Sequence, residues 1–273
     1  MNAKLLDGRS VSTQIKEKLK AEIDKSKLKP KLAVILIGDN KVSEIYVRMK
    51  EKAAVKIGCG FEFIKKPAKT TQEQVERLID KLNKEKSVTG VIVQKPLPKH
   101  INSDEIGLLL SPEKDVDGLN PISPFIPATA RGILEILDHY KVGISGKKVA
   151  VVGTSKLVGR PTGLELQKKG ALVTFCDDKT SDLASKTKEA DILVVAVGKP
   201  KLIKANMVKK GVVVIDVGIN RIETGDKKQA TSIVGDVDFD EVSDLASYIT
   251  PVPGGVGPMT VAALMQNLVD AAA

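Results

Sequence analysis

Residues 147–161 of this chain read KKVAVVGTSKLVGRP. The first part is a short β-branched run typical of a buried strand, and a glycine turn and a helix N-terminus follow it. This order brings backbone N–H groups close enough to bind a pyrophosphate. Gly153 permits the turn, and Gly159 permits close packing of helix on strand. Because Ser155 replaces the middle glycine of a regular G-x-G-x-x-G motif, an ordinary strand–helix turn remains an alternative.

The rest of the second half repeats this pattern. Short apolar runs at 171–176, 192–197 and 212–217 alternate with charged segments of helical spacing. Continuous β-branched runs separated by helices indicate a parallel sheet with helices on both faces. The charged segment Arg221–Lys228 around Gly225 predicts the tip of a hairpin.

The first half has the same organisation. Its pattern predicts strands at 31–38, 61–64 and 88–93, with helices at 43–56 and 71–84. A proline-rich segment, 111–128, ends the series and predicts a linker at the floor of a cleft, before a helix at 129–140. The predicted class is therefore α/β.

Composition excludes several kinds of protein. The 273 residues include 43 Lys and Arg, 34 Asp and Glu and no Trp, which gives a net charge of +9. Basic and acidic residues are interspersed, so we interpret the charge as a solvated surface or as a field for a small anionic substrate. The low content of aromatic residues argues against a surface that stacks nucleic-acid bases. Two cysteines are too few for a disulfide framework, and two cysteines with two histidines argue against a metal site. No signal-peptide or membrane-spanning run is visible, so we expect a cytoplasmic protein.

Polar or glycine residues follow the predicted strands of the second half. Asp177 or Asp178 lies where an acid can accept hydrogen bonds from the adenosine ribose and repel a 2′-phosphate. Gly198 and Gly218 follow the next two strands. Because ligands bind outside the carboxyl ends of such strands, these turns are expected to flank one crevice. Polar turns and sharp strand exits are the alternative interpretation.

Three residues of the first half suggest proton chemistry. Tyr46 and Lys50 share one helix face, and desolvation can lower the pKa of a lysine enough for it to transfer protons. Gln94, at the end of a strand, can orient that lysine without neutralising it. Asp117 can bind the edge of an amino-pyrimidine ring, although Asp-Gly is also a common turn. A solvated helix lysine is the alternative for Lys50.

Residues 251–260 open the last predicted helix, which starts near Val256. Three glycines and three prolines fix an irregular backbone there, which favours a backbone cradle for a ligand over a simple linker.

Taken together, these motifs resemble the bifunctional methylenetetrahydrofolate dehydrogenase/methenyltetrahydrofolate cyclohydrolase family. The similarity is collinear from Asp7-Gly8 to the final helix. The motifs that carry it are Ser43–Lys50, Gln94 with Pro96-Leu97-Pro98, Lys114–Gly118, Val158–Pro161, Val214–Asn220 and Thr250–Thr260.

The resemblance implies a substrate and catalytic domain over residues 1–120, joined by the C-terminal helix 257–273. It implies a Rossmann dinucleotide-binding domain with a mostly parallel sheet over 121–256, a cleft between the two and a homodimer. Hydride would pass from the bridging methylene carbon of tetrahydrofolate to NADP or NAD, and water would then open the methenyl product to formyltetrahydrofolate. No metal, nucleic acid or membrane is implied.

The resemblance makes Lys50 the proton-shuttling residue, with Tyr46, Gln94 and Asp117 as its catalytic partners. Motifs and resemblance together assign to the folate substrate Tyr46, Lys50, Gln94, Pro96, Leu97, Asp117, Pro253, Gly254 and Gly255. They assign to the dinucleotide Gly153, Thr154, Ser155, Val158, Gly159, Arg160, Asp177, Asp178, Val197, Gly198, Gly218, Ile219 and Thr260.

The chain departs from the family pattern in three respects, the third of which concerns the cofactor and involves two positions. Lys95 stands where the family has leucine, and Ala130 stands where it has a proline. Thr154 replaces an arginine of many NADP-using members, and the Asp177-Asp178 pair replaces their His-Ser or His-Arg. The last two changes favour NAD, although Arg160, Lys156 or Lys179 can still bind a 2′-phosphate.

Three alternatives stay open. A dehydrogenase without cyclohydrolase activity would keep the second-half motifs, but the presence of Lys50, Gln94 and Asp117 argues against it. A shikimate-dehydrogenase-like protein has a similar two-domain plan, which residues 251–260 fit poorly. A non-catalytic nucleotide- or nucleic-acid-binding protein has only the positive charge in its support.

Overall fold

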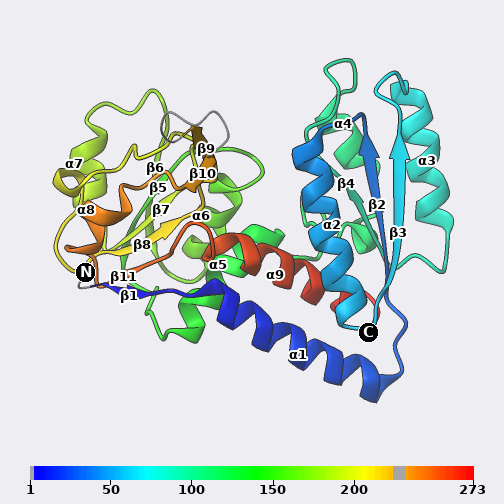
Figure 1. Ribbon diagram of the computed structural model, residues 1–273, viewed down its shortest axis with the longest axis horizontal. Helices are drawn as coiled ribbons and strands as arrows, with labels where there is room; N and C mark the ends of the chain where they lie inside the picture. Colours follow the sequence, from blue (N-terminus) through cyan, green and yellow to red (C-terminus); the bar gives the residue numbers. More distant parts are fainter. Residues whose placement is uncertain (1–2, 224–230) are drawn as a thin grey trace. The chain divides into compact units, whose positions relative to one another are not determined.

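The computed structural model describes residues 3–223 and 231–273, and the chain divides into two compact units (Figure 1). The first unit contains residues 1–12 and 129–260, and the second contains residues 13–128 and 261–273. Each unit therefore combines segments from distant parts of the chain.

The first unit is built on a sheet of six parallel strands in the order β1-β11-β8-β7-β5-β6. Strands β7 and β8 are buried along their whole length, and β5 is buried after its first residue, because both faces of the sheet are covered. The strands are β1 (Lys4–Leu5), β5 (Lys148–Val152), β6 (Leu172–Cys176), β7 (Ile192–Val195), β8 (Val213–Asp216) and β11 (Tyr248–Ile249).

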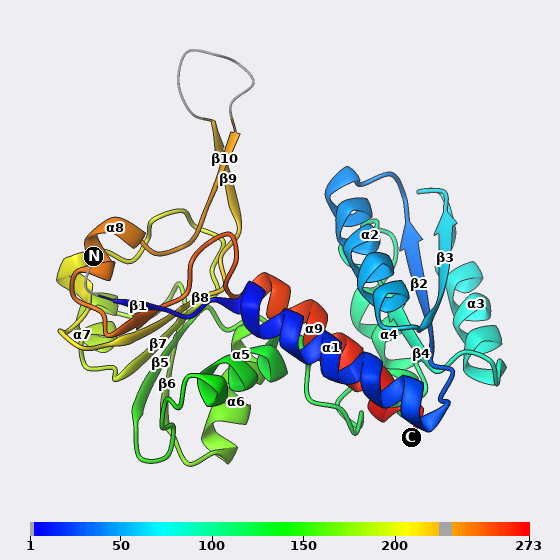
Figure 2. The ribbon, with the colours of Figure 1, turned by 60° about the horizontal axis from the view of Figure 1, so that its bottom comes forward.

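Helices cover both faces of this sheet (Figure 2). Successive strand residues point to opposite faces. Phe175 lies against Gly163 of α6, whereas Cys176 packs in a buried cluster with residues of α7 and α8. The mostly parallel α/β architecture predicted from the sequence is thus confirmed. The helices are α5 (Ala128–His139), α6 (Gly159–Lys168), α7 (Leu183–Lys188), the short 3-10 helix η2 (Ala205–Met207) and α8 (Phe239–Ser243).

A hairpin extends from the first unit. Strands β9 (Asn220–Glu223) and β10 (Thr231–Val234) pair antiparallel, with Asn220 opposite Val234 (Figure 2). The hairpin is therefore present, while its predicted tip at Gly225 lies outside the described residues.

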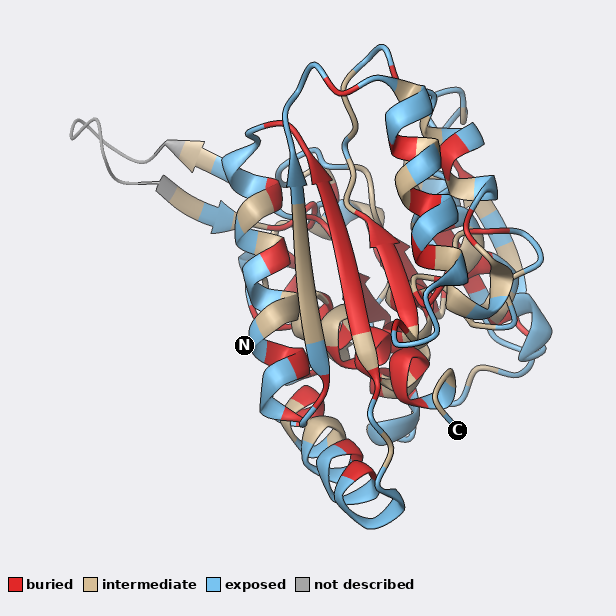
Figure 3. Cartoon of the chain, turned by 90° about the vertical axis from the view of Figure 1, so that its right-hand side faces the viewer, coloured by how far each residue is buried: buried red, intermediate tan, exposed pale blue. Residues whose placement is uncertain are grey.

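The second unit has a parallel sheet of three strands in the order β3-β2-β4. Leu32 and Val34 of β2 pack with residues of α1, α2 and α9, whereas Ala33 and Ile35 pack with residues of α3 and α4. Figure 3 shows β2 and β4 buried between these layers. The strands are β2 (Lys31–Ile37), β3 (Gly60–Lys66) and β4 (Gly90–Val93).

The helices of this unit follow the predicted alternation with strands. Thr71 caps α3 in a reciprocal capping box with Gln74. The helices are α1 (Gly8–Ser26), α2 (Lys41–Lys56), α3 (Gln72–Lys84), α4 (Ser103–Leu108), the 3-10 helix η1 (Pro112–Lys114) and α9 (Val256–Asp270), of which α1 and α9 begin in residues of the first unit.

Candidate active site

A lysine–glutamine pair lies at the carboxyl end of β4 in the second unit. The Asn40 side chain accepts a hydrogen bond from the Ser43 N–H at 3.0 Å and so caps α2, the helix that carries Lys50. Lys50 Nζ donates to Gln94 Oε1 at 3.0 Å. Gln94 Nε2 in turn donates to the Lys95 carbonyl at 2.8 Å, which orients the amide oxygen toward the lysine.

The surroundings of Lys50 favour its neutral form. Burial lowers the pKa of Lys50, and the Asp117 carboxylate partly opposes that effect. Gln94 adds an acceptor without adding a charge, so it holds the ammonium group without restoring its usual pKa. A lysine whose pKa is lowered in this way gives up its proton more readily than a solvated lysine, which suits it to proton transfer.

The two acids of the η1 turn have different surroundings. Asp115 is 1% exposed and accepts a hydrogen bond from the Asn120 N–H at 2.7 Å, and burial raises its pKa to about 6. Asp117 is only partly buried, and its backbone carbonyl accepts from the Ala128 N–H. Asp115 therefore holds the turn, and Asp117 presents its carboxylate. Asp117 and Lys95 both line a small cavity of about 20 Å³.

The structure brings Lys50, Gln94 and Asp117 together. It places Tyr46 on the same helix as Lys50, one turn earlier, and partly buried. Pro96 and Leu97 follow Gln94 and Lys95 in the chain, and Leu97 packs on the cluster formed by β2, β4, α3 and α4.

The predicted pyrophosphate turn lies in the first unit, between β5 and α6. Gly153 has a φ of +96°, and a Cβ there would overlap the Ala196 carbonyl. A Cβ on Gly159 would overlap the Gly153 carbonyl. No side chain caps α6 at Val158, although the Ser155 hydroxyl accepts a weak bond from the Val158 N–H at 3.3 Å. Both glycines are thus needed for the close approach of turn and helix. Arg160 and Thr154 flank them, exposed and partly exposed respectively.

Asp177 and Asp178, after β6, are both exposed but differ in their contacts. Asp177 Oδ1 accepts hydrogen bonds from the Lys179 N–H at 3.0 Å and the Thr180 hydroxyl at 3.1 Å. Asp178 makes no hydrogen bond or ion pair with any described residue. One of the two acids is therefore engaged in its own turn, and the other is available to a ligand.

The turns after β7 and β8 are held by two buried acids that sequence reasoning did not single out. Val197 and Gly198 donate their backbone N–H groups to Asp236, and Gly218 donates to Asp216. Burial raises the pKa of Asp216 to about 6. Ile219, in contrast, is 48% exposed. An acid at the end of the apolar run 213–216 was the available signal for Asp216.

The loop at 251–257 is anchored by the first residues of the chain. The Arg9 N–H donates to the Gly254 carbonyl at 3.0 Å, and a Cβ on Gly8 would overlap the Gly255 carbonyl. Pro253 precedes these glycines. The hydroxyl of Thr260, one turn into α9, donates to the Thr129 hydroxyl at 3.3 Å. These residues belong to the first unit.

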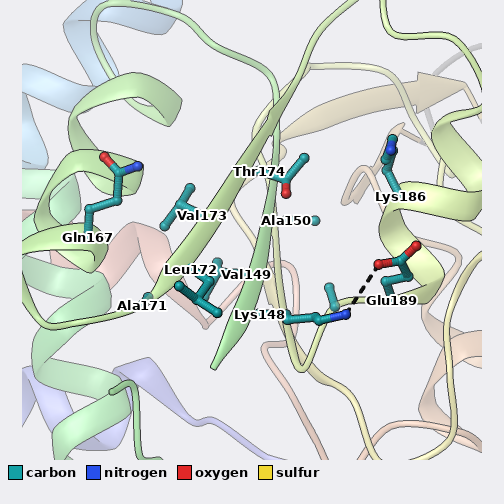
Figure 4. Close-up of a pocket in the computed structure, with 11 residues that line it drawn as sticks. Lys148, Val149, Ala150, Gln167, Ala171, Leu172, Val173, Thr174, Lys186 and Glu189 are labelled. Atoms are coloured by element: carbon teal, nitrogen blue, oxygen red, sulfur yellow. Dashed lines mark hydrogen bonds and ion pairs between the residues drawn. The ribbon is translucent and has the colours of Figure 1, made fainter. Parts of the chain in front are cut away.

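A hollow of about 440 Å³ lies at the amino ends of β5 and β6 (Figure 4). Lys148 pairs with Glu189 across it at 3.4 Å. The predicted dinucleotide turns follow the carboxyl ends of these strands, so this hollow is separate from the dinucleotide turns. Among the described residues, no group of His, Cys, Asp or Glu could hold a metal, and no helix is long and apolar enough to cross a membrane.

The sheet of the first unit and its glycine turn define the class as an α/β protein with a Rossmann dinucleotide-binding domain. Residues 6–117 match the catalytic domain of the tetrahydrofolate dehydrogenase/cyclohydrolase family, and residues 127–273 match its NAD(P)-binding domain. The chain belongs to this family.

Individual relatives agree with this assignment. The bifunctional protein FolD of Thermodesulfovibrio yellowstonii is 47% identical, covering 100% of this chain and 97% of its own length. The crystal structure of the Campylobacter jejuni enzyme FolD has a TM-score of 0.94 at 44% identity, covering 99% of this chain and 98% of that one. A Trypanosoma brucei FolD structure with NADP and an inhibitor also has a TM-score of 0.94, at 36% identity, with 98% and 97% coverage.

Proposed function

We propose that this chain oxidises 5,10-methylenetetrahydrofolate to 5,10-methenyltetrahydrofolate, with NAD or NADP as hydride acceptor, and then hydrolyses the product to 10-formyltetrahydrofolate. The family supports both activities. The observation that carries the second one is the 3.0 Å hydrogen bond from Lys50 to Gln94, at a lysine whose pKa is lowered by burial.

Lys50 is proposed to move protons during hydrolysis. Water adds to the bridging carbon, so that a C–O bond forms and one C–N bond breaks. The water loses two protons as the formyl C=O forms: one passes through Lys50 Nζ to the released nitrogen, and the other leaves to solvent because the methenyl substrate is a cation, so the lysine is unchanged at the end. Gln94 keeps Nζ in place throughout, because its amide is itself anchored on the Lys95 carbonyl.

Asp117 is proposed to bind the amino-pyrimidine edge of the pterin. Its carboxylate is the accessible one of the turn, while Asp115 is enclosed. We assign Tyr46, Pro96 and Leu97 to the walls of the same pocket. Pro253, Gly254 and Gly255 remain proposed substrate contacts.

The residues after β5 fit a dinucleotide. Two glycines leave no room for side chains, and α6 has no side-chain cap at Val158. Because the Arg160 N–H already donates to the Ser155 carbonyl and Pro161 has no N–H, a phosphate would be bound in this first turn through the Gly159 N–H. When bound, the nicotinamide supplies the hydride acceptor. We assign to its binding site Gly153, Thr154, Ser155, Val158, Gly159, Arg160, Asp177, Asp178, Val197, Gly198, Gly218, Ile219 and Thr260.

We propose a preference for NAD over NADP. Asp178 is exposed and uncommitted, so its charge would meet a 2′-phosphate unless a basic residue such as Arg160 intervened. We also propose a homodimer in the cytoplasm, on the strength of the family resemblance. Light scattering on the purified protein tests the dimer.

The test of function separates the two activities. Purified protein is given methylenetetrahydrofolate with NAD or NADP, and separately preformed methenyltetrahydrofolate without either. We expect reduced nicotinamide in the first assay and loss of methenyl absorbance above the spontaneous rate in the second. Activity in the first assay alone would support a dehydrogenase-only protein, and activity in neither would overturn the proposal.

A further inference from the structure

Two buried carboxylates, Asp216 and Asp236, lie side by side in the first unit. Asp216 ends β8 and is 3% exposed, while Asp236 follows β10 and is fully buried. Neither makes an ion pair with a described residue. Buried charges are normally paired, so their hydrogen bonds must compensate for the lost solvent.

The Asp236 carboxylate binds two segments at once. Its Oδ2 accepts from the backbone N–H groups of Val197 at 2.7 Å and Gly198 at 2.9 Å. Its Oδ1 accepts from the Asn220 side-chain amide at 2.8 Å. Asp236 therefore joins the turn after β7 to the start of β9.

The Asp216 carboxylate holds Asp236 in turn. Its Oδ1 accepts from the backbone N–H groups of Gly218 at 2.9 Å and Asp236 at 3.0 Å, and its Oδ2 accepts from Val237 at 2.9 Å. All these donors are backbone groups. The two acids thus link three segments, 196–198, 216–220 and 235–237, into one network.

Glycines are required around this network. A Cβ on Gly218 would overlap the Asp236 carboxylate, and a Cβ on Gly235 would overlap the Asp216 carboxylate. The N–H groups of Val197, Gly198 and Gly218 all donate to the two acids. They are therefore not free to bind a phosphate, and these turns can contribute to a ligand site only through their shape and their other atoms.

We infer that Asp216 and Asp236 are positioning residues that fix the turns at 197–198 and 218–219 for the dinucleotide. This inference rests on the proposed function, which assigns those turns to the cofactor. Neither acid is proposed to touch the cofactor.

The two acids differ in how well an amide can replace them. In Asp236→Asn, the amide oxygen can still face Val197 and Gly198, and its NH₂ can donate to Asn220 once the Asn220 amide rotates. In Asp216→Asn, the positions of both carboxylate oxygens face backbone N–H donors. The NH₂ group that replaces one oxygen must therefore face a donor, with which it cannot form a hydrogen bond. The substitution at 216 should therefore have the larger effect.

The experiment measures binding and both activities in Asp216→Asn, Asp236→Asn and the control Asp240→Asn, an exposed acid of α8. The Kd for reduced dinucleotide is followed by its fluorescence, and cyclohydrolase activity is measured on preformed methenyltetrahydrofolate. We expect the Kd to rise about tenfold for Asp216→Asn and about two- to threefold for Asp236→Asn, with cyclohydrolase activity retained.

Two results would overturn the inference. One is a Kd in Asp216→Asn equal to that of the control. The other is a parallel loss of dinucleotide binding and cyclohydrolase activity, which would show a general structural role. Failure of the proposed function is distinguishable, because the unmodified protein would then bind no dinucleotide at all.

Discussion

The two units hold their functional groups in different ways. In the second unit, the proposed chemistry depends on one side chain, Lys50. Gln94 fixes its position by a hydrogen bond, and burial lowers its pKa. In the first unit, the proposed cofactor site is mostly backbone, shaped by glycines at β5 and by buried acids at β7 and β8. A single substitution should therefore remove the chemistry of the second unit, whereas a large loss of dinucleotide affinity in the first unit should require its backbone to move.

The largest effect is expected for Lys50→Met. Without a group to move protons, cyclohydrolase activity should fall about 10²- to 10⁴-fold. Stability should be kept, because a desolvated ammonium group is replaced by an apolar chain of similar length. Hydrolysis of methenyltetrahydrofolate and thermal unfolding are the measurements, with the exposed Lys52→Met of the same helix as control. Full hydrolysis by Lys50→Met would remove Lys50 from the mechanism.

The next effect is expected for Gly159→Ala, which tests the backbone site. Its Cβ would overlap the Gly153 carbonyl, so the turn must open. Overpacking of this kind costs about 1–3 kcal/mol, and dinucleotide affinity should fall about tenfold or more. Gly143→Ala is the matched control, since nothing lies within 4 Å of a Cβ there. Equal affinities in the two variants would show that the close approach is dispensable.

The sequence predicted those features whose signal is local. Strands β2, β7 and β8 are continuous apolar runs rich in β-branched residues, and such runs occur where a strand is buried on both faces. The pairing of Lys50 with Gln94 could be anticipated because one residue lies on a helix face and the other at a strand end.

Features that depend on the fold could not be predicted in this way. Strand β1 has only two residues, both exposed, so no pattern marks it. Helix α1 was missed although apolar residues recur at positions 11, 15, 19 and 23. Asp216 and Asp236 are twenty residues apart and meet only because β10 returns to the end of β8. Likewise, nothing local showed that Asp115 is enclosed and Asp117 is not.

A pH profile sharpens the account of the lysine site. In Gln94→Glu, a carboxylate replaces the amide oxygen that lies 3.0 Å from Lys50 Nζ. A neighbouring negative charge stabilises the ammonium form and so raises the pKa of Lys50, opposing the lowering by burial. The midpoint of the cyclohydrolase pH profile should therefore move to higher pH. Gln14→Glu, on the exposed side of α1, should leave it in place. An unchanged midpoint or a shift to lower pH would show that the pH profile does not report the protonation of Lys50.

The smallest effect concerns the choice of dinucleotide. Asp178→Ser removes an uncommitted charge, so the ratio of NADP to NAD affinity should rise about three- to tenfold. Asp177→Ser should change that ratio less and instead loosen the turn, because Asp177 Oδ1 accepts from Lys179 and Thr180. Fluorescence titration with NADH and NADPH gives the ratio, with Asp240→Ser as control. An unchanged ratio in both variants would mean that neither acid faces the ribose, and that cofactor choice in this unit depends on Arg160 or on the backbone alone.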